Sequence, residues 1–229
     1  MLIAASQPYF CPFPGFFYKI NQCDVFVILD RVQFPRGTTW LSRNRFKNDR
    51  GTLWITVPVW KKGLGLQKID EVKICHEGRW RRKHLESLRT AYAHAPYFED
   101  HLELVLETFS AKYEKMLDMN MQVIKYIAAF LNIRSKILLL SDLGLESTGS
   151  RLLVDICRIL GGGRFLAQSA AAKYLEEGLF EEADIKVEYL RYPTLVYPQL
   201  WGDFIPNLSA LDLIFNCGPK ARNILLGRS

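Results

Sequence analysis

The stretch that decides the fold is LIAASQPYFCPFPGFFYKINQCDVFVIL, residues 2–29. The apolar run at 2–5 predicts a strand, and residues 16–22 predict a short helix. Between them the prolines and the glycine of residues 6–15 exclude regular helix and central strand. Residues 25–29 (VFVIL) form the continuous β-branched run typical of a buried parallel strand. Strand, loop, helix and strand in this order predict a βαβ unit.

The same alternation continues to the C-terminus. Further strands are expected at 53–59, 137–140, 164–167 and 185–190, with the alternating segment 69–74 as a partner of the first. Helices are expected at 80–94, twice within 97–131, at 150–160 up to the glycines 161–163, at 170–177, and from the Ser209 cap to about 218. Residues 31–50 are expected to form a loop or irregular hairpin. We therefore predict a single α/β domain over 1–229, with an open, largely parallel, Rossmann-like sheet flanked by helices and a helical insertion around 80–132.

Composition fits an ordinary globular protein. Hydrophobic residues make up 49% and charged residues 24% of the 229 residues, which excludes disorder as the default. The five cysteines are widely spaced and lack a C-x-x-C motif, which argues against a disulfide framework and for reduced thiols. The N-terminus does not resemble a signal peptide, and the apolar stretches are too short to span a bilayer. The expected location is the cytoplasm, without membrane insertion.

The charge pattern favours an anionic partner. The formal charge is +6, and basic residues cluster within 31–50 and 79–89. A small anionic sugar or nucleotide is expected rather than nucleic acid, because no recognised nucleic-acid motif accompanies the clusters. The four histidines lack metal-binding spacing, so no metal is expected.

Several polar side chains follow predicted strands, where open α/β sheets bind ligands. Gln7 and Tyr9 follow the first strand, and Asp30 and Gln33 follow the second. Gln7 and Asp30 are the candidates nearest the reacting group. The alternatives are a rigid packing turn for Gln7 and Tyr9 and a helix or loop cap for Asp30. Lys173 follows a later strand and is a secondary candidate.

The basic segment offers the strongest candidate binding set: Arg36, Trp40, Arg43, Asn44 and Arg45. Arginine forks grip phosphate or carboxylate, and a tryptophan face stacks on a base or sugar ring. The alternative is a solvated basic loop.

Five further candidates are more isolated. Lys83 and His84 would place a phosphate ligand and a general base on a helix, or be surface charge. Tyr197 and Gln199 would close a substrate pocket or satisfy buried groups. Cys11 is a candidate nucleophile but has no identifiable partner, and a lone cysteine is usually a packed thiol.

Motifs along most of the chain resemble the WbqC-like protein family. They include Ser6-Gln7-Pro8-Tyr9-Phe10, Gly15-Phe16-Phe17, Arg43-Asn44-Arg45, Ala95-Pro96-Tyr97-Phe98, Tyr197-Pro198-Gln199 and Asp212-Leu213-Ile214-Phe215-Asn216-Cys217-Gly218. The chain departs from the family pattern at Ser6, where many members have His, and at residues 36–39, where Lys and Ser are commoner. The first departure argues against an obligatory histidine base at that position.

The resemblance implies a role in bacterial surface-polysaccharide (O-antigen) or modified-sugar pathways. The implied enzyme is a transferase or ligase that puts an acyl or aminoacyl group on a nucleotide-linked amino sugar, with ATP or acyl-CoA as candidate donor. Gln33-Phe34 after the second strand is also similar to pantothenate-synthetase-like ligases, but the paired His-x-Gly-His of that group is missing. The alternatives are a non-catalytic binding or scaffold protein of the same pathway, or a basic nucleic-acid-binding protein. Gln7, Asp30, Arg43 and Lys83 around one pocket would favour the enzyme, whereas a flat basic face would favour binding alone.

Overall fold

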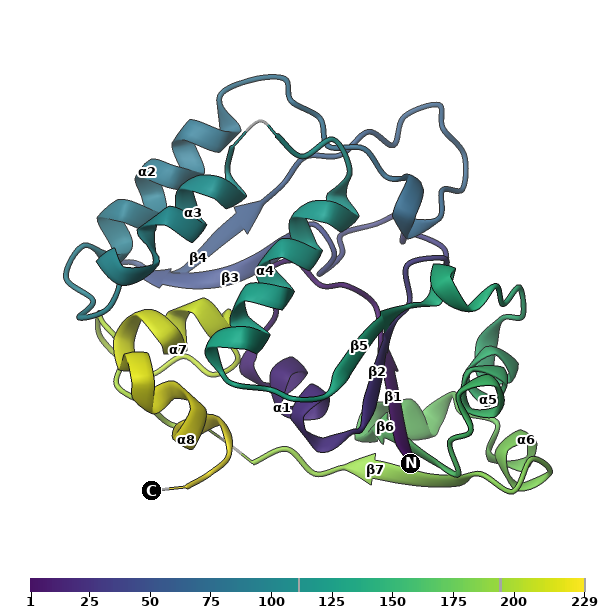
Figure 1. Ribbon diagram of the computed structural model, residues 1–229. Helices are drawn as coiled ribbons and strands as arrows, with labels where there is room; N and C mark the ends of the chain where they lie inside the picture. The colour runs from purple at the N-terminus through teal and green to yellow at the C-terminus, as the bar shows by residue number, and fades with distance from the viewer. Residues whose placement is uncertain (111, 194, 229) are drawn as a thin grey trace.

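The computed structural model describes residues 1–110, 112–193 and 195–228. Within these ranges the central sheet has five parallel strands in the order β5-β2-β1-β6-β7 (Figure 1). The strands are β1 (Leu2–Ser6), β2 (Val25–Ile28), β5 (Lys136–Leu139), β6 (Arg164–Gln168) and β7 (Lys186–Leu190). Every residue of β1 and β2 is buried, as expected for strands covered on both faces. The α/β class, the parallel sheet and the flanking helices are thus as predicted.

The strand order has one reversal. The chain moves from β1 to β2 to β5 in one direction, then crosses to β6 and β7 on the other side of β1. The reversal lies between β1 and β6. In open α/β sheets this is the topological switch point, where the connections leave a crevice at the carboxyl ends of the strands.

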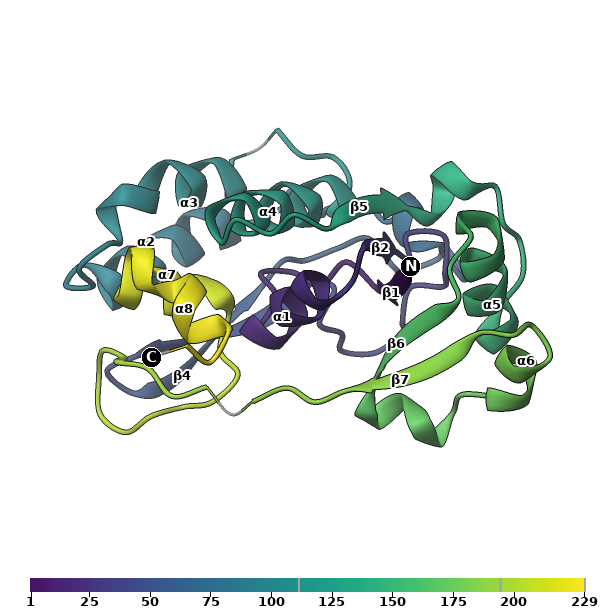
Figure 2. The ribbon, with the colours of Figure 1, turned by 60° about the horizontal axis from the view of Figure 1, so that its bottom comes forward.

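Helices cover both faces of the sheet. Helices α1 (Pro14–Gln22) and α4 (Met116–Phe130) lie on one face, and α5 (Gly149–Leu160) and α6 (Glu177–Glu181) on the other (Figure 2). Alternate residues of β1 divide between the two cores: Ala4 packs with α1, and Ile3 packs with α5. This division follows from the side-chain period of two in a strand.

The chain between β2 and β5 forms a large insertion. It contains the antiparallel hairpin β3 (Arg43–Asn48) and β4 (Gly51–Thr56), the helices α2 (Trp80–Tyr92) and α3 (Leu102–Thr108), and short 3-10 helices at Ile69–Glu71 and Glu99–His101 before α4. At the C-terminus, α7 (Ala210–Cys217), a 3-10 helix at Gly218–Lys220 and α8 (Ala221–Leu225) pack beside α1. Two side chains attach this insertion to the β1–α1 loop. Asn44 Nδ2 donates to the carbonyls of Phe10 (2.9 Å) and Cys11 (2.7 Å), and Asn120 Nδ2 donates to Pro8 O at 2.7 Å.

Some local predictions were wrong or only partly right. The loop or irregular hairpin expected at 31–50 is in part a regular hairpin, because β3 occupies Arg43–Asn48 and pairs with β4, with Asn44 and Phe46 buried on one face. The predicted strand 69–74 begins instead as a 3-10 helix, Ile69–Glu71, and its expected pairing with 53–59 is limited to an isolated bridge from Ile74 to Val59. The predicted helix 170–177 is a 3-10 helix, Ser169–Lys173, and the next α-helix, α6, begins only at Glu177. The hydroxyl of Ser169 donates to Leu190 O at 2.7 Å.

The predicted helix ends are confirmed. Gly161 ends α5 with a φ of 68°, a left-handed value that favours glycine. Ser209 caps α7, with its hydroxyl accepting from Leu211 N at 3.3 Å. As for the membrane, none of the helices that the structure describes has both the length and the apolar character to cross a bilayer.

Candidate functional site

A hollow of about 620 Å³ lies at the carboxyl ends of β2 and β5. The segments after these two strands form one wall, and the first turn of α5 forms another. The chain before the 3-10 helix Ile69–Glu71 closes it, because Gln33 and Lys68 pair their backbones there. The hollow therefore occupies the edge of the sheet at which α/β proteins bind ligands, and we call it the β2–β5 hollow.

The N-terminus of α5 opens toward this hollow. Gly144, Thr148 and Gly149 line it, and the N-cap residue Thr148 makes no side-chain capping bond in the part of the chain that the structure describes. The neighbouring Ser150 hydroxyl is used elsewhere, because it accepts from Glu176 N at 3.0 Å. The first amides of a 12-residue helix are thus without a side-chain cap beside a cavity. Such amides, with the helix dipole, attract an anion.

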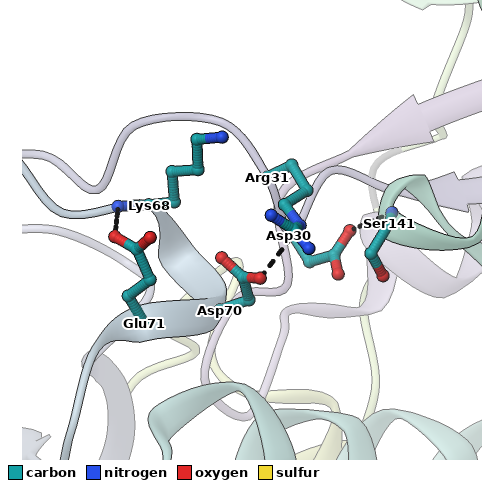
Figure 3. Close-up of polar contacts among 6 residues, drawn as sticks. All are labelled: Asp30, Arg31, Lys68, Asp70, Glu71 and Ser141. Carbon is teal, nitrogen blue, oxygen red and sulfur yellow. Dashed lines mark hydrogen bonds and ion pairs between the residues drawn. The ribbon is translucent and has the colours of Figure 1, made fainter. Parts of the chain in front are cut away.

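Asp30 is buried next to the hollow, with 1% of its surface exposed. Its Oδ1 accepts from the backbone N–H of Ser141 at 3.0 Å, and Ser141 lines the hollow (Figure 3). Its Oδ2 is buried and has no hydrogen-bond partner among the described residues. An unpaired buried carboxylate oxygen is costly to the fold, so a hydrogen-bond donor that reached this atom would be bound favourably.

Two cations belong to the same hollow. Arg31 Nε pairs with Asp70 Oδ2 at 3.0 Å, which holds the arginine beside Asp30 (Figure 3). Lys68 also lines the hollow, and its ammonium makes no ion pair with any residue of 1–110, 112–193 or 195–228. The hollow thus combines a helix N-terminus and two cations, with a half-satisfied carboxylate next to it. This set suits a ligand that carries an anionic group and a hydrogen-bond donor.

A second hollow of about 450 Å³ adjoins the first and shares Gln67 with it. Arg36, Lys61 and Lys62 line it. The Lys61 ammonium donates to the carbonyls of Pro35, Arg36 and Gly37, and burial lowers its pKa. Lys61 therefore holds the loop, while Arg36 and Lys62 extend the basic character of this edge.

The predicted arginine set forms a separate, exposed surface on the hairpin. The Arg43 guanidinium lies 3.8 Å from the centre of the Trp54 ring, and that of Arg45 lies 5.9 Å from Trp40. Trp40 and Trp54 are 44% and 42% exposed, and their ring centres are 5.7 Å apart. We call these four residues the arginine–tryptophan surface. Asn44 points to the opposite face of β3, toward the β1–α1 loop, so the structure places it with the core contacts.

The other predicted residues are dispersed. Gln7 and Tyr9 follow β1 and are half-buried, and Lys173 is exposed after β6. Lys83 lines a different hollow, of about 540 Å³, together with Asp49 and Trp201.

His84 lies on α2, against the end of β4 in the hairpin. Its Nε2 is 2.8 Å from Thr56 O, and its ring packs against Trp80 and Phe109. Burial lowers the pKa of His84, and the Thr56 carbonyl opposes this. The imidazole is therefore neutral near pH 7, at a place away from the β2–β5 hollow.

Tyr197 and Gln199 belong to a buried polar network. The Tyr197 hydroxyl donates to Asp212 Oδ2 at 2.9 Å, and Lys47 Nζ donates to Gln199 Oε1 at 3.2 Å. Gln199 also binds the backbone of Ile205 through both amide atoms. The structure thus pairs both residues with neighbours in the protein.

Cys11 is also a packed side chain. It is 1% exposed, and burial raises the pKa of its thiol above the ordinary range. A thiol without thiolate character is a poor nucleophile.

Comparison with known sequences agrees with the pattern of motifs. The profile of the WbqC-like protein family matches residues 7–224. The chain belongs to this family. It is also 31% identical over 226 residues to "Uncharacterized protein Rv1507c" of Mycobacterium tuberculosis, an alignment that covers 97% of this chain and 96% of that relative. No solved structure gives a significant match.

Sequence reasoning missed several residues of the β2–β5 hollow in this WbqC-like protein. Arg31, Lys68 and Asp70 come together only because the insertion folds back on β2. Thr148, just before α5, was a readable signal for the start of a helix. In the described ranges no group of three or more His, Cys, Asp or Glu side chains could hold a metal ion.

Proposed function

We propose that this WbqC-like protein is a group-transfer enzyme, a transferase or ligase, that binds a phosphate-bearing sugar in the β2–β5 hollow. The observation that carries the proposal is the unpaired, buried Oδ2 of Asp30 beside the uncapped N-terminus of α5. The unpaired carboxylate oxygen suits an amine or hydroxyl that gives up a proton, and the start of α5 suits a phosphate. The start of α5 lines the cavity, and Asp30 lies next to it.

The proposed roles follow from the charges. The amides at the start of α5, with Lys68 and Arg31, hold the phosphate. The nitrogen or oxygen of the acceptor's amine or hydroxyl attacks the carbonyl of an activated acyl donor, and Asp30 Oδ2 accepts the proton that the acceptor loses. The new bond forms at the carbonyl carbon, and the donor's leaving group departs with its bonding electrons. Gln33 lines the same cavity and can orient the sugar.

Family membership supports the choice of sugar chemistry. The resemblance implies surface-polysaccharide or modified-sugar pathways, and an amino sugar supplies both the amine and, when nucleotide-linked, the phosphate. Arg43 and Lys83 lie outside the β2–β5 hollow, so the proposal rests on Asp30, Gln33 and α5.

A binding protein without catalysis is the second candidate. The arginine–tryptophan surface favours it, because two half-exposed tryptophans, one with the Arg43 guanidinium over its ring, form a platform for an anionic, ring-containing ligand. This platform is on the hairpin and not in the β2–β5 hollow.

A thermal-shift panel distinguishes the two candidates. ATP, nucleotide sugars, acyl-CoAs and short oligonucleotides are tested on the wild type, Lys68→Ala and Arg43→Ala. A ligand that binds only the folded state at about 100 times its Kd adds roughly 2.7 kcal/mol. A shift with a nucleotide sugar that is lost in Lys68→Ala and kept in Arg43→Ala supports the enzyme site.

The reverse pattern supports binding at the arginine–tryptophan surface and contradicts the proposal. So does a shift with oligonucleotide alone. Lys136→Ala is the matched control, because Lys136 is an exposed lysine at the amino end of β5, whereas the hollow lies at the carboxyl end of that strand. It is expected to keep every wild-type shift.

A further inference from the structure

The cavity that adjoins the β2–β5 hollow is strongly basic. Arg36, Lys61 and Lys62 line its volume of about 450 Å³, and none of the described residues around it is acidic. These three cations make no ion pair within residues 1–110, 112–193 and 195–228. The β2–β5 hollow differs, because the acidic residue Glu146 lines it. We call the second cavity the basic hollow, and its uncompensated charge attracts an anion.

Lys61 fixes these cations in place. Its ammonium donates to the carbonyls of Pro35 (3.4 Å), Arg36 (3.3 Å) and Gly37 (3.0 Å), which uses all three of its donors. The backbone of Arg36 is thereby tied to the loop that carries Lys61 and Lys62. The cluster is therefore largely organised before a ligand arrives, which reduces the ordering cost of binding.

The same cluster is costly to the fold when no anion is bound. The hydrogen-bond acceptors of the Lys61 ammonium are neutral, and like charges in one cavity disfavour one another. Burial lowers the pKa of Lys61, as expected for a cation without an acidic partner. In a solvated basic loop the side chains spread apart, whereas here the hydrogen bonds of Lys61 keep its loop beside Arg36. A phosphate in the basic hollow supplies the negative charge that the lining residues lack.

A paired backbone separates the basic hollow from the β2–β5 hollow. Phe34 N donates to Gln67 O at 2.9 Å, and the neighbouring residues Gln33 and Lys68 form a backbone bridge. Gln67 lines both cavities, and no cation among the described residues lines both. A phosphate held at the start of α5 with Lys68 therefore leaves the basic hollow without an anion.

We propose, resting on the function proposed for the β2–β5 hollow, that the basic hollow is a subsite for a second phosphate group, bound by Arg36 and Lys62. A guanidinium grips two phosphate oxygens at once, and an ammonium adds a compact positive charge. The second phosphate has two chemical sources. It belongs either to the nucleotide part of the sugar substrate or to a phosphate-bearing acyl donor such as a coenzyme A thioester.

Both sources fit the spacing of the two cavities. Arg31 lines the first and Arg36 the second, and five positions of sequence separate them, so their backbones lie at most about 18 Å apart. An extended nucleotide sugar reaches over such a distance. A donor bound in the basic hollow lies next to the cavity in which the acceptor reacts. The subsite thus suits a reaction between two bound substrates.

The test is isothermal titration calorimetry of the full chain with inorganic pyrophosphate at constant ionic strength. The wild type is expected to bind pyrophosphate in each cavity. Arg36→Ala/Lys62→Ala is expected to weaken one of the two sites by about tenfold or more, since hydrogen bonds to charged groups are lost, and Lys68→Ala weakens the other. The matched control Arg89→Ala/Lys125→Ala removes two exposed cations that line neither cavity, and it is expected to bind as the wild type does.

Equal pyrophosphate binding by the wild type and Arg36→Ala/Lys62→Ala overturns the proposal, whatever Lys68→Ala does. A site lost in Arg36→Ala/Lys62→Ala while Lys68→Ala binds as the wild type does supports the subsite and contradicts the function proposed for the β2–β5 hollow. Arg36 and Lys62 are exposed and Lys68 is half-buried, so the urea midpoints of these variants are expected to match that of the wild type.

Two further probes identify the source of the second phosphate. If it belongs to the sugar substrate, uridine diphosphate N-acetylglucosamine binds more weakly to both Arg36→Ala/Lys62→Ala and Lys68→Ala. If it belongs to the donor, coenzyme A binds more weakly to Arg36→Ala/Lys62→Ala, and the nucleotide sugar is weakened only in Lys68→Ala. A nucleotide sugar and coenzyme A that both bind Arg36→Ala/Lys62→Ala as tightly as the wild type would contradict a phosphate subsite in the basic hollow.

Discussion

The Tyr92 hydroxyl donates a hydrogen bond of 2.7 Å to Asp212 Oδ1, joining α2 to α7 through two side chains that are buried. Tyr197 donates to the other carboxylate oxygen, at 2.9 Å. Burial raises the pKa of Asp212, and the hydrogen bonds of the tyrosines and the charge of Lys47 oppose that rise. Asp212 is thus a buried carboxyl group whose hydrogen bonds come from two tyrosine hydroxyls.

Asp212 is expected to make stability fall as the pH rises above about 3.8, its ordinary pKa. Its folded pKa is the higher one, so between the two values the folded protein keeps a proton that the unfolded chain has lost. The free energy of unfolding decreases with pH in that window. Urea unfolding across the acid range measures the slope of the free energy of unfolding against pH, which is expected to be more positive in Asp212→Asn.

The control for this prediction is Asp184→Asn, at an exposed aspartate before β7. It should reproduce the wild-type slope. An Asp212→Asn protein with the wild-type slope would show that Asp212 does not titrate as proposed.

Asn44→Ala is expected to destabilise the fold by about 2–3 kcal/mol, because it leaves buried carbonyls without their donor. Asn44 Nδ2 donates to Phe10 O and Cys11 O, and its Oδ1 accepts from Arg45 N at 2.7 Å. The matched control is Asn48→Ala on the same strand, where the side chain accepts only from Arg50 N in an exposed turn and the cost is expected below about 1 kcal/mol. Urea unfolding compares the two variants. Equal losses of stability would show that the hydrogen bonds from Asn44 to the β1–α1 loop contribute no more than those of an exposed turn.

The β1–α1–β2 unit and the parallel sheet were readable from the sequence, because their apolar runs are buried on both faces. Strand β3 was not, because its buried residues include the polar Asn44 and Lys47, which interrupt any apolar pattern. The β2–β5 hollow was predictable only in part. Asp30 and Gln33 directly follow a predicted strand, whereas Lys68 is brought beside Gln33 by a backbone bridge between residues far apart in the sequence. Lys19, which is 3% exposed on α1, gave no local signal of its burial, since a lysine on a short helix is ordinarily at the surface.

Lys19→Met is expected to stabilise the fold at pH 7 by up to roughly 3 kcal/mol, at 1.36 kcal/mol per pKa unit. The folded pKa is lowered from 10.5 to about 8. Between these values the unfolded chain binds a proton that the folded protein does not, so wild-type stability rises with pH there. The advantage of Lys19→Met should therefore shrink as the pH approaches 10.5. Urea unfolding of the wild type and Lys19→Met at pH 7 and near pH 10.5 checks this difference in stability. A variant less stable than the wild type at both would mean that the lysine serves the fold.

Asp30→Asn tests the proposed base with little change of shape. The asparagine oxygen can still accept from Ser141 N, so the loss of stability is expected to stay below about 1 kcal/mol. The amide that replaces Oδ2 cannot take a proton, and turnover of the nucleotide sugar identified by the thermal-shift panel is expected to fall by about 10²–10⁴-fold with ligand binding retained. Asp155→Asn is the control, because Asp155 lies on α5 and pairs with Arg151 at 3.4 Å on the helix surface. If Asp30→Asn keeps full turnover, Asp30 holds the Ser141 loop and the base is another group; if it loses binding and turnover together, Asp30 binds substrate without taking its proton.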